Sequence, residues 1–383
     1  MNNFTFENTT RIHFGEGQIQ AISKEIAKDK KVLLLYGGGS IKQNGVYQQV
    51  EKALSEHQWG EFSGIAPNPQ FDTLMQAVAK IKTEGFDYLL AVGGGSVIDG
   101  TKFIAAAAHY QGQDPWDMLK NAEHITSALP LACVLTLPAT GTESNCGSVV
   151  SRGEDKLGFG SSLLRPRFAI LDPSTTLSLS PRQIANGVVD AFVHVVEQYV
   201  TYPVNAKVQD RFAEGLLLTL IEEGPKALTT PDDLQVRANI MWSATQALNG
   251  LIGVGVPQDW TSHMIGHELT AQHGIDHARS LSIMFPAVLK QRREQKKAKL
   301  LQYAERVFGI TQGSDDQRID AAIQQTVQFF KQMQVPTSLK DVGLTQTDIA
   351  PLIAGLKRHD QTALSEHGDI TPEQSQTILE AAL

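Results

Sequence analysis

The first half of the chain alternates short apolar runs with segments of helical periodicity. Four runs resemble buried strands that end in glycine, proline or threonine turns: KVLLLYGGGS (31–40), DYLLAVGGGS (87–96), LACVLTLPATGTES (131–144) and RFAILDP (167–173). Helical stretches such as YQQVEKAL and TLMQAVAKIKTEG lie between them. This alternation predicts a parallel sheet covered by helices, and such sheets bind ligands at the carboxyl ends of their strands.

The strand-like runs stop after about residue 180. The segment SPRQIANGVVDAFVHVVEQYV opens with Ser-Pro, a favourable helix start. Later segments, including DRFAEGLLLTLIEEG, QVRANIMWSATQAL and RIDAAIQQTVQFFKQM, have helical periodicity. The pattern predicts an α/β N-terminal domain over residues 1–180 and an all-helical C-terminal domain over residues 181–383.

Composition narrows the classes of partner. Of 383 residues, 41 are acidic and 33 basic, so an electrostatic footprint for nucleic acid is not expected. The one basic run, KQRREQKKAKL (290–300), predicts a solvated helix face. The chain has no secretory signal pattern, no apolar run long enough to span a bilayer, and only two cysteines. We therefore expect a soluble, cytoplasmic protein without a nucleic-acid or membrane partner.

Glycine-rich turns follow two of the predicted strands. AVGGGSVIDG places three glycines between an apolar strand and a helix, where bare backbone and free N–H groups favour phosphate. YGGGS repeats this turn after an earlier strand, and PATGTES adds hydroxyl groups after a third. Neither glycine turn is a P-loop or a G-x-G-x-x-G fingerprint, so a phosphate-bearing cofactor across several strand ends fits better. Alternatively, Ser96 and Asp99 serve only to cap a helix.

Histidines concentrate in HMIGHELTAQHGIDH (263–277), which holds four of the eleven in the chain. In DAFVHVVEQY, Asp190 and His194 lie four residues apart, so both side chains can reach one ion from the same helix face. The first two histidines of the run, His263 and His267, have the same spacing. One carboxylate with several imidazoles suits Zn or Fe. For Asp190 and His194, an ordinary hydrogen-bonded pair remains the alternative.

GGGSVIDGTK, LPATGTESN, DAFVHVVEQY and HMIGHELTAQHGIDH, in this order, resemble the metal-dependent group III alcohol dehydrogenases, often called iron-containing. NGVVDAFVHVVEQYVT and LLQYAERV look like the NADPH-dependent aldehyde reductase and butanol dehydrogenase branch of that family. The resemblance spans essentially the whole chain. It implies a dehydroquinate-synthase-like fold with a Rossmann-like and a helical domain. It also implies reversible reduction of short-chain aldehydes to primary alcohols, and a homodimer.

The resemblance also assigns residues. It places Asp190, His194, His263 and His277 on the metal, leaves His267 as a proton-relay candidate, and gives His273 no role. Asp99, expected near the nicotinamide, is the second catalytic candidate and a cofactor contact. The other cofactor contacts that we expect are Gly38, Gly39, Ser40, Asn68, Gly94, Gly95, Ser96, Thr136, Thr140, Thr142, Lys156 and Leu177.

The residue at position 38 indicates which nicotinamide cofactor the protein prefers. Gly38 stands where NAD-preferring relatives carry an acidic residue, which would repel a ribose 2′-phosphate. Ser40 and Lys42 follow and are able to contact phosphate. We therefore expect NADP(H). Asp276 and Ala278 replace the Pro and Gly that often flank the last histidine of the family, so we expect the pocket rim to differ.

Two other enzyme classes fit the sequence less well. A dehydroquinate-synthase-like, metal- and NAD-dependent lyase handles an anionic substrate and should gather Lys and Arg near its metal. VPQDWTSHMIGHEL contains neither residue type. A metallohydrolase is disfavoured because HMIGH lacks the glutamate of H-E-x-x-H. The alcohol dehydrogenase interpretation is therefore preferred, with the lyase as the alternative.

Overall fold

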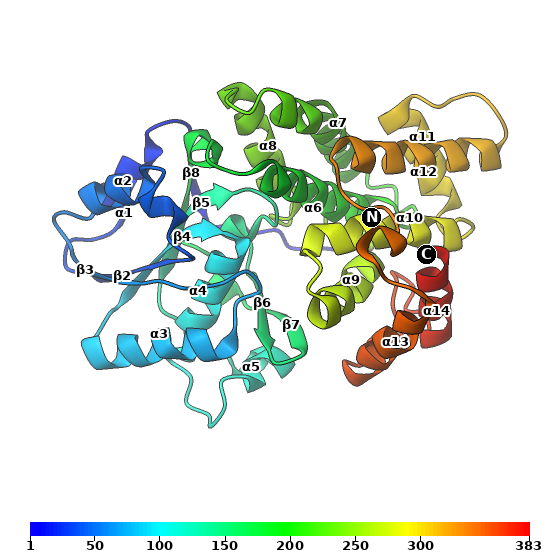
Figure 1. Ribbon diagram of the computed structural model, residues 1–383. Helices are drawn as coiled ribbons and strands as arrows, with labels where there is room; N and C mark the ends of the chain where they lie inside the picture. Colours follow the sequence, from blue (N-terminus) through cyan, green and yellow to red (C-terminus); the bar gives the residue numbers. More distant parts are fainter. The chain divides into compact units, whose positions relative to one another are not determined.

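The computed structural model describes residues 1–383, which form two compact units (Figure 1). One unit, here the sheet unit, consists of Glu7–Leu179 and Asp232–Thr245. The other, the helical unit, consists of Met1–Phe6, Ser180–Pro231 and Gln246–Leu383. The chain therefore contributes one segment from beyond residue 180 to the sheet unit, and its first six residues to the helical unit.

A six-stranded, all-parallel sheet forms the core of the sheet unit. Its strand order is β1 (Arg11–Phe14), β8 (Phe168–Leu171), β5 (Leu131–Leu137), β4 (Tyr88–Gly94), β2 (Lys31–Tyr36) and β3 (Gln58–Phe62). The four apolar runs of the sequence correspond to β2, β4, β5 and β8, which confirms them as strands. The sequence pattern missed β1 and β3, because these edge strands are partly exposed and lack a continuous apolar run.

Helices cover both faces of the sheet. Alternate residues of β2 enter different cores: Leu33 and Leu35 pack with α3 (Phe71–Glu84) and α4 (Gly95–Ala107), whereas Val32 and Leu34 pack with α1 (Ile22–Glu25) and α2 (Val46–Ala53). Burial on both faces explains why the central strands are apolar throughout. The unit also holds α5 (Asp117–Lys120), most of α8 (Leu234–Ala247), and an antiparallel hairpin of β6 (Gly147–Arg152) and β7 (Asp155–Gly160) that the sequence pattern did not predict.

The helical unit is built around α6 (Pro181–Tyr199), in which every residue from Gly187 to Tyr199 is buried. Ser180 and Gln183 form a capping box at its start, with Pro181 in the first turn, as the Ser-Pro signal predicted. None of the helices of the chain is both long and apolar enough to cross a membrane. The remaining helices are α7 (Lys207–Thr229), α9 (Thr261–His273), α10 (His277–Gln291), α11 (Lys297–Phe308), α12 (Asp315–Gln332), α13 (Ile349–Arg358) and α14 (Pro372–Ala381).

The prediction that the basic run 290–300 forms a solvated helix face is wrong. The run is divided between the end of α10 and the start of α11, and Arg292, Lys296 and Lys299 are all buried. Each forms an ion pair with a carboxylate from a distant part of the chain, namely Asp369, Asp259 and Asp210 respectively. A buried cation needs such a partner, and pairing between distant segments leaves no trace in local periodicity.

Candidate metal centre and cofactor loops

Three helices of the helical unit bring a carboxylate and two imidazoles together. Asp190 comes from the middle of α6, His263 from the first turn of α9, and His277 is the first residue of α10. One donor atom from each lies within 4.8 Å of the others. Asp190 and His263 are buried and His277 is half-buried. Three donors at this separation can share one ion.

His194, one turn after Asp190 on α6, adds a third imidazole beside this group. Its Nε2 lies 3.0 Å from Nε2 of His263, and its Nδ1 lies 3.7 Å from Oδ1 of Asp190. The latter distance is longer than a hydrogen bond, so these two side-chain atoms are not hydrogen-bonded to each other. Burial lowers the pKa of His194 to about 4. A neutral imidazole is the form that binds a metal, so the residues present fit a divalent ion of the zinc or iron type.

The other two histidines of the run lie apart from these donors. His267 is half-buried on α9 and is not in the group of clustered donors. Its ring centroid lies 5.2 Å from that of His277 and 6.4 Å from that of His263, so it borders the group. His273 is exposed at the end of α9, where Gly274 terminates the helix with φ 67°. The spacing of His263 and His267 on one helix thus does not decide which histidines meet.

Sequence reasoning missed Glu197, which contacts His263 from behind. Glu197 lies on α6, three residues after His194, and is 2% exposed. Its Oε2 contacts His263 Nδ1, and its Oε1 accepts a hydrogen bond from the backbone N–H of Ser262 at 2.7 Å. Burial, together with the nearby charge of Asp259, raises the pKa of Glu197 well above its usual range. The signal in the sequence was an acidic residue within an apolar stretch of helix.

Asp276 fastens the start of α10 to α6. Its Oδ2 accepts hydrogen bonds from Nε of Arg182 and Nδ2 of Asn186, both at 2.8 Å. Asn186 lies one turn before Asp190, and its Oδ1 accepts from Nε of Arg279 at 3.2 Å. Polar contacts of Asp276, the residue before His277, therefore hold the start of α10 in place.

The glycine turns of the sheet unit lie at the ends of neighbouring parallel strands. Gly37–Ser40 follows β2, Gly93–Ser96 spans the end of β4, and Thr140–Thr142 follows β5. In the sheet, β4 pairs with β2 on one side and with β5 on the other. From β2 the chain continues to β3 on one side, and it then crosses back to β4 on the other side of β2. The boundary between β2 and β4 is therefore a topological switch point of the sheet. Ligands of open α/β sheets bind at such a point.

The alternative that Ser96 and Asp99 only cap a helix is wrong. Helix α4 begins at Gly95 after the N-cap Gly94, without a side-chain cap, so Ser96 already lies inside its first turn. Asp99 instead joins neighbouring segments: its Oδ1 accepts from Oγ1 of Thr142 at 2.5 Å, and its Oδ2 accepts from the backbone N–H of Val149 at 3.0 Å. Burial raises the pKa of Asp99.

Glycine is required at the start of α4. A Cβ on Gly95 would lie 2.8 Å from Oγ1 of Thr140, so only glycine allows the first turn of α4 to approach the loop after β5 this closely. Gly95 and Thr140, both expected to contact the cofactor, are thereby packed against each other. The backbone at the end of β4 carries no side chain at Gly95.

Lys102 is a second residue that sequence reasoning missed. It is fully buried on α4, three residues after Asp99. Its Nζ donates to Oγ1 of Thr142 at 2.7 Å, Oδ1 of Asn145 at 3.0 Å and the carbonyl of Gly147 at 2.7 Å. Burial lowers the pKa of Lys102 to about 8, although the charge of Asp99 opposes this. Lys102 thus holds the loop after β5 to the start of the β6–β7 hairpin.

The other expected cofactor residues are distributed around these loops. Gly38 and Ser40 are exposed after β2, Lys156 lies on β7, and Leu177 is 36% exposed before α6. Asn68 has a left-handed φ of 54° shortly before α3, and Thr136 is half-buried on β5. Nζ of Lys42 lies 3.2 Å from Oε1 of Glu61, an acceptor on β3 that the sequence did not reveal. Contact of these residues with a cofactor stays a prediction.

Comparison with known proteins shows which family the chain matches. Residues 9–173 match the family described as iron-containing alcohol dehydrogenase, and residues 184–383 match the C-terminal family of Fe-containing alcohol dehydrogenases. The chain is 58% identical to the NADPH-dependent aldehyde reductase YqhD of Escherichia coli, covering 100% of both chains. It is 40% identical to the probable NADH-dependent butanol dehydrogenase 1 of Bacillus subtilis, covering 91% of this chain and 92% of that protein. A crystal structure of the E. coli protein superposes with a TM-score of 0.99, at 58% identity, covering 100% of this chain and 99% of the other.

Proposed function

The chain belongs to the iron-containing alcohol dehydrogenase family, and from that premise we propose that it catalyses the metal-dependent, NADPH-dependent, reversible reduction of short-chain aldehydes to primary alcohols. The observation that carries the proposal is the meeting of Asp190, His263 and His277 within 4.8 Å in a chain that matches an NADPH-dependent aldehyde reductase over its whole length. We also propose that residues 1–180 serve the cofactor and residues 181–383 the metal.

We infer that Asp190, His194, His263 and His277 hold one divalent ion, Zn or Fe. Such an ion supplies Lewis-acid polarisation of a carbonyl oxygen when it is bound. The protein contributes the neutral imidazole of His194 and the buried carboxylate of Asp190, and the contacts of Asp276 hold the start of α10 near them. This donor set suits both metals, so elemental analysis of protein purified without added metal is needed to identify the ion.

Reduction of an aldehyde takes up one hydride at carbon and one proton at oxygen. We propose that His267 moves the proton, because its ring borders that of His277 while its side chain is only half-buried, whereas His263 is buried. An unperturbed imidazole titrates close to working pH, which suits a group that exchanges protons with solvent. His273, exposed at the end of α9, has no place in this scheme.

We propose that NADP(H) binds across the ends of β2, β4 and β5, where it supplies the hydride. The turn Gly93–Ser96 and the N-terminus of α4 would bind its pyrophosphate, and Asp99 would lie near the nicotinamide. Gly38, which carries no side chain, leaves room for a 2′-phosphate beside Ser40. The further contacts proposed are Gly39, Asn68, Gly94, Gly95, Thr136, Thr140, Thr142, Lys156 and Leu177.

Steady-state kinetics with butanal and each nicotinamide cofactor test the proposed reaction. We expect aldehyde-dependent oxidation of NADPH, with a higher kcat/KM for NADPH than for NADH. Equal values, or a preference for NADH, would refute the cofactor assignment, and the absence of any aldehyde-dependent oxidation would refute the reaction. A panel of aldehydes of increasing chain length defines the substrate range.

The lyase alternative gains no support from the site. Arg182 and Arg279 both pair with Asp276, the residue before His277, at 2.8 and 3.6 Å, so each has a carboxylate partner of its own within the protein. The cytoplasmic location and the homodimer stay predictions. Sedimentation of the purified protein tests the second of these.

A further inference from the structure

Glu197 joins α6 to the start of α9 by three contacts. Its side chain contacts Nδ1 of His263 and accepts from the backbone N–H of Ser262 at 2.7 Å. Its own carbonyl accepts from the backbone N–H of Asp259 at 2.9 Å. The two elements that carry His194 and His263 are therefore tied together beside the proposed metal site.

A carboxylate is the side chain that matches these neighbours. Glu197 directs one oxygen to Nδ1 of His263 and the other to the N–H of Ser262, so its carboxyl group presents two oxygens to two neighbours. When His263 binds an ion through Nε2, its Nδ1 carries the proton, and an amide of the same shape then has only one acceptor for the two N–H groups of His263 and Ser262. When Nδ1–H of His263 is bound in this way, its Nε2 is left to face Nε2 of His194.

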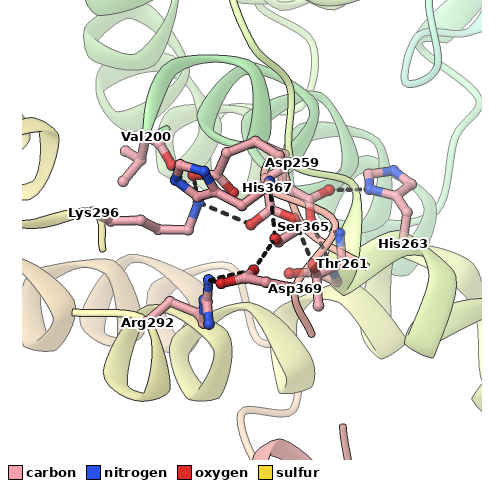
Figure 2. Close-up of polar contacts among 12 residues, drawn as sticks. Val200, Asp259, Thr261, His263, Arg292, Lys296, Ser365, His367 and Asp369 are labelled. Atoms are coloured by element: carbon pink, nitrogen blue, oxygen red, sulfur yellow. Dashed lines mark hydrogen bonds and ion pairs between the residues drawn. The ribbon is translucent and has the colours of Figure 1, made fainter. Parts of the chain in front are cut away.

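Behind Glu197 lies a fully buried cluster of charge. Nζ of Lys296 lies 2.9 Å from Oδ2 of Asp259 and 2.6 Å from Oε1 of Glu366, and donates to the carbonyl of Val200 at 2.9 Å. Figure 2 shows Lys296 at one end of this network and His263 at the other, with Asp259 labelled between them. Asp259 in turn accepts from the N–H and the hydroxyl of Thr261, which fixes the first turn of α9. The segment that carries His263 is thus held by buried contacts that reach as far as Lys296.

We propose that Glu197 is a positioning residue for the metal centre: it orients the ring of His263 so that Nε2 points at the ion, with the Asp259–Lys296 pair fixing the segment that carries His263. The inference rests on the metal site of the proposed function. Carboxylates that hydrogen-bond a metal-bound histidine tune the affinity of the ion without touching it.

Zinc affinity separates this role from a structural one. Apoproteins of the wild type, Glu197→Gln, Glu197→Asp and a control, Glu214→Gln, would be titrated with Zn²⁺ against a chromophoric chelator. Glu214 is a matched control because it is also buried and hydrogen-bonded in the helical unit, but through Tyr199 and Arg306 on the neighbouring helices. We expect Glu197→Gln to weaken Zn²⁺ binding by about 10- to 100-fold. Glu214→Gln should keep the wild-type affinity, and Glu197→Asp, which retains both acceptors on a shorter stem, should fall between.

Two further measurements complete the test. The visible spectrum of the Co²⁺-loaded protein should change in Glu197→Gln and not in Glu214→Gln, because a reoriented ligand alters the field at the ion. Wild-type Zn²⁺ affinity in a folded Glu197→Gln protein overturns the proposal. If that variant does not fold, Glu197→Asp decides: weakened binding supports the role and unchanged binding overturns it. A wild-type protein that binds no Zn²⁺ or Co²⁺ would instead overturn the proposed metal site itself, and this inference with it.

Discussion

Nε2 of His194 lies 3.0 Å from Nε2 of His263, although the two residues are separated by 69 positions in the sequence. Both side chains are buried, and burial lowers the pKa of His194 to about 4. Two imidazole nitrogens from different helices thus face each other close to Asp190, a separation at which they are able to share one ion. This arrangement motivates the first prediction.

Replacing His263 by alanine should remove the ion. One of the four proposed ligands is lost, so we expect metal affinity to fall by more than the roughly 100-fold typical of outer-sphere changes, with almost complete loss of activity. Elemental analysis of the purified variant checks this. Retention of one ion per chain would show that His263 is not a ligand.

Replacing His267 by alanine should leave the ion in place. His267 lies outside the clustered donors, so metal content should match the wild type. Loss of a proton-transferring group should lower kcat by about 10²-fold or more and change its dependence on pH. The measurement is the kcat–pH profile alongside metal analysis. If the variant lost its metal, the division of roles between His263 and His267 would be wrong.

Gly38→Asp should reduce the preference for NADPH without disturbing the fold. A Cβ on Gly38 meets no atom within 4 Å, whereas Gly39 has a left-handed φ of 93°. A carboxylate at position 38 should repel a 2′-phosphate and lower kcat/KM for NADPH by about 10-fold or more. Gly39→Ala is the contrasting variant, expected to lose stability through backbone strain. An unchanged cofactor ratio in Gly38→Asp would place the 2′-phosphate elsewhere.

Lys102 should make stability depend on alkaline pH. Its pKa falls from 10.5 to about 8 in the folded protein because of burial. Between these two values the unfolded chain binds a proton that the folded protein does not, so stability rises with pH across this window and levels off above 10.5. Urea unfolding of the wild type and Lys102→Met over this range checks the sign. A free-energy difference between them that stays constant with pH would contradict it.

Asp369→Asn should destabilise the protein through the buried guanidinium of Arg292. Arg292 donates to both oxygens of Asp369, at 2.6 and 2.7 Å. Although burial alone would raise it, these bonds hold the pKa of Asp369 below its usual value. Because Asp369 is partly exposed, we expect a loss of about 1 kcal/mol at neutral pH. The loss should vanish as pH falls below about 3.9 and through the lower folded pKa, where Asp369 is protonated.

The matched control for this prediction is Asp320→Asn. Asp320 pairs at 2.9 Å with Arg293, which is more exposed and has a second carboxylate partner in Asp316. Removal of Asp320 should therefore cost little free energy of unfolding. Equal losses in the two variants, measured by denaturant unfolding, would show that burial of Arg292 does not matter.

Whether a strand could be predicted from the sequence depended on how completely it is buried. Strands β2, β4, β5 and β8 were predictable because burial on both faces makes them apolar throughout. The half-exposed strands β1 and β3 and the β6–β7 hairpin were not, because their residues follow no single apolar pattern. Buried charge was the other failure: Lys102, Glu197 and Lys296 are polar residues whose burial depends on partners far along the chain.

The sequence by itself determined what local periodicity controls. It placed glycine turns at the ends of strands, put Asp190 and His194 on one helix face, and ended α9 at Gly274. The tertiary structure alone decided which side chains meet. Spacing favoured His267 as the companion of His263, yet His277, from another helix, joins Asp190 and His263. The reason is physical: helical spacing fixes neighbours on one element, whereas the packing of α6, α9 and α10 fixes which elements share a site.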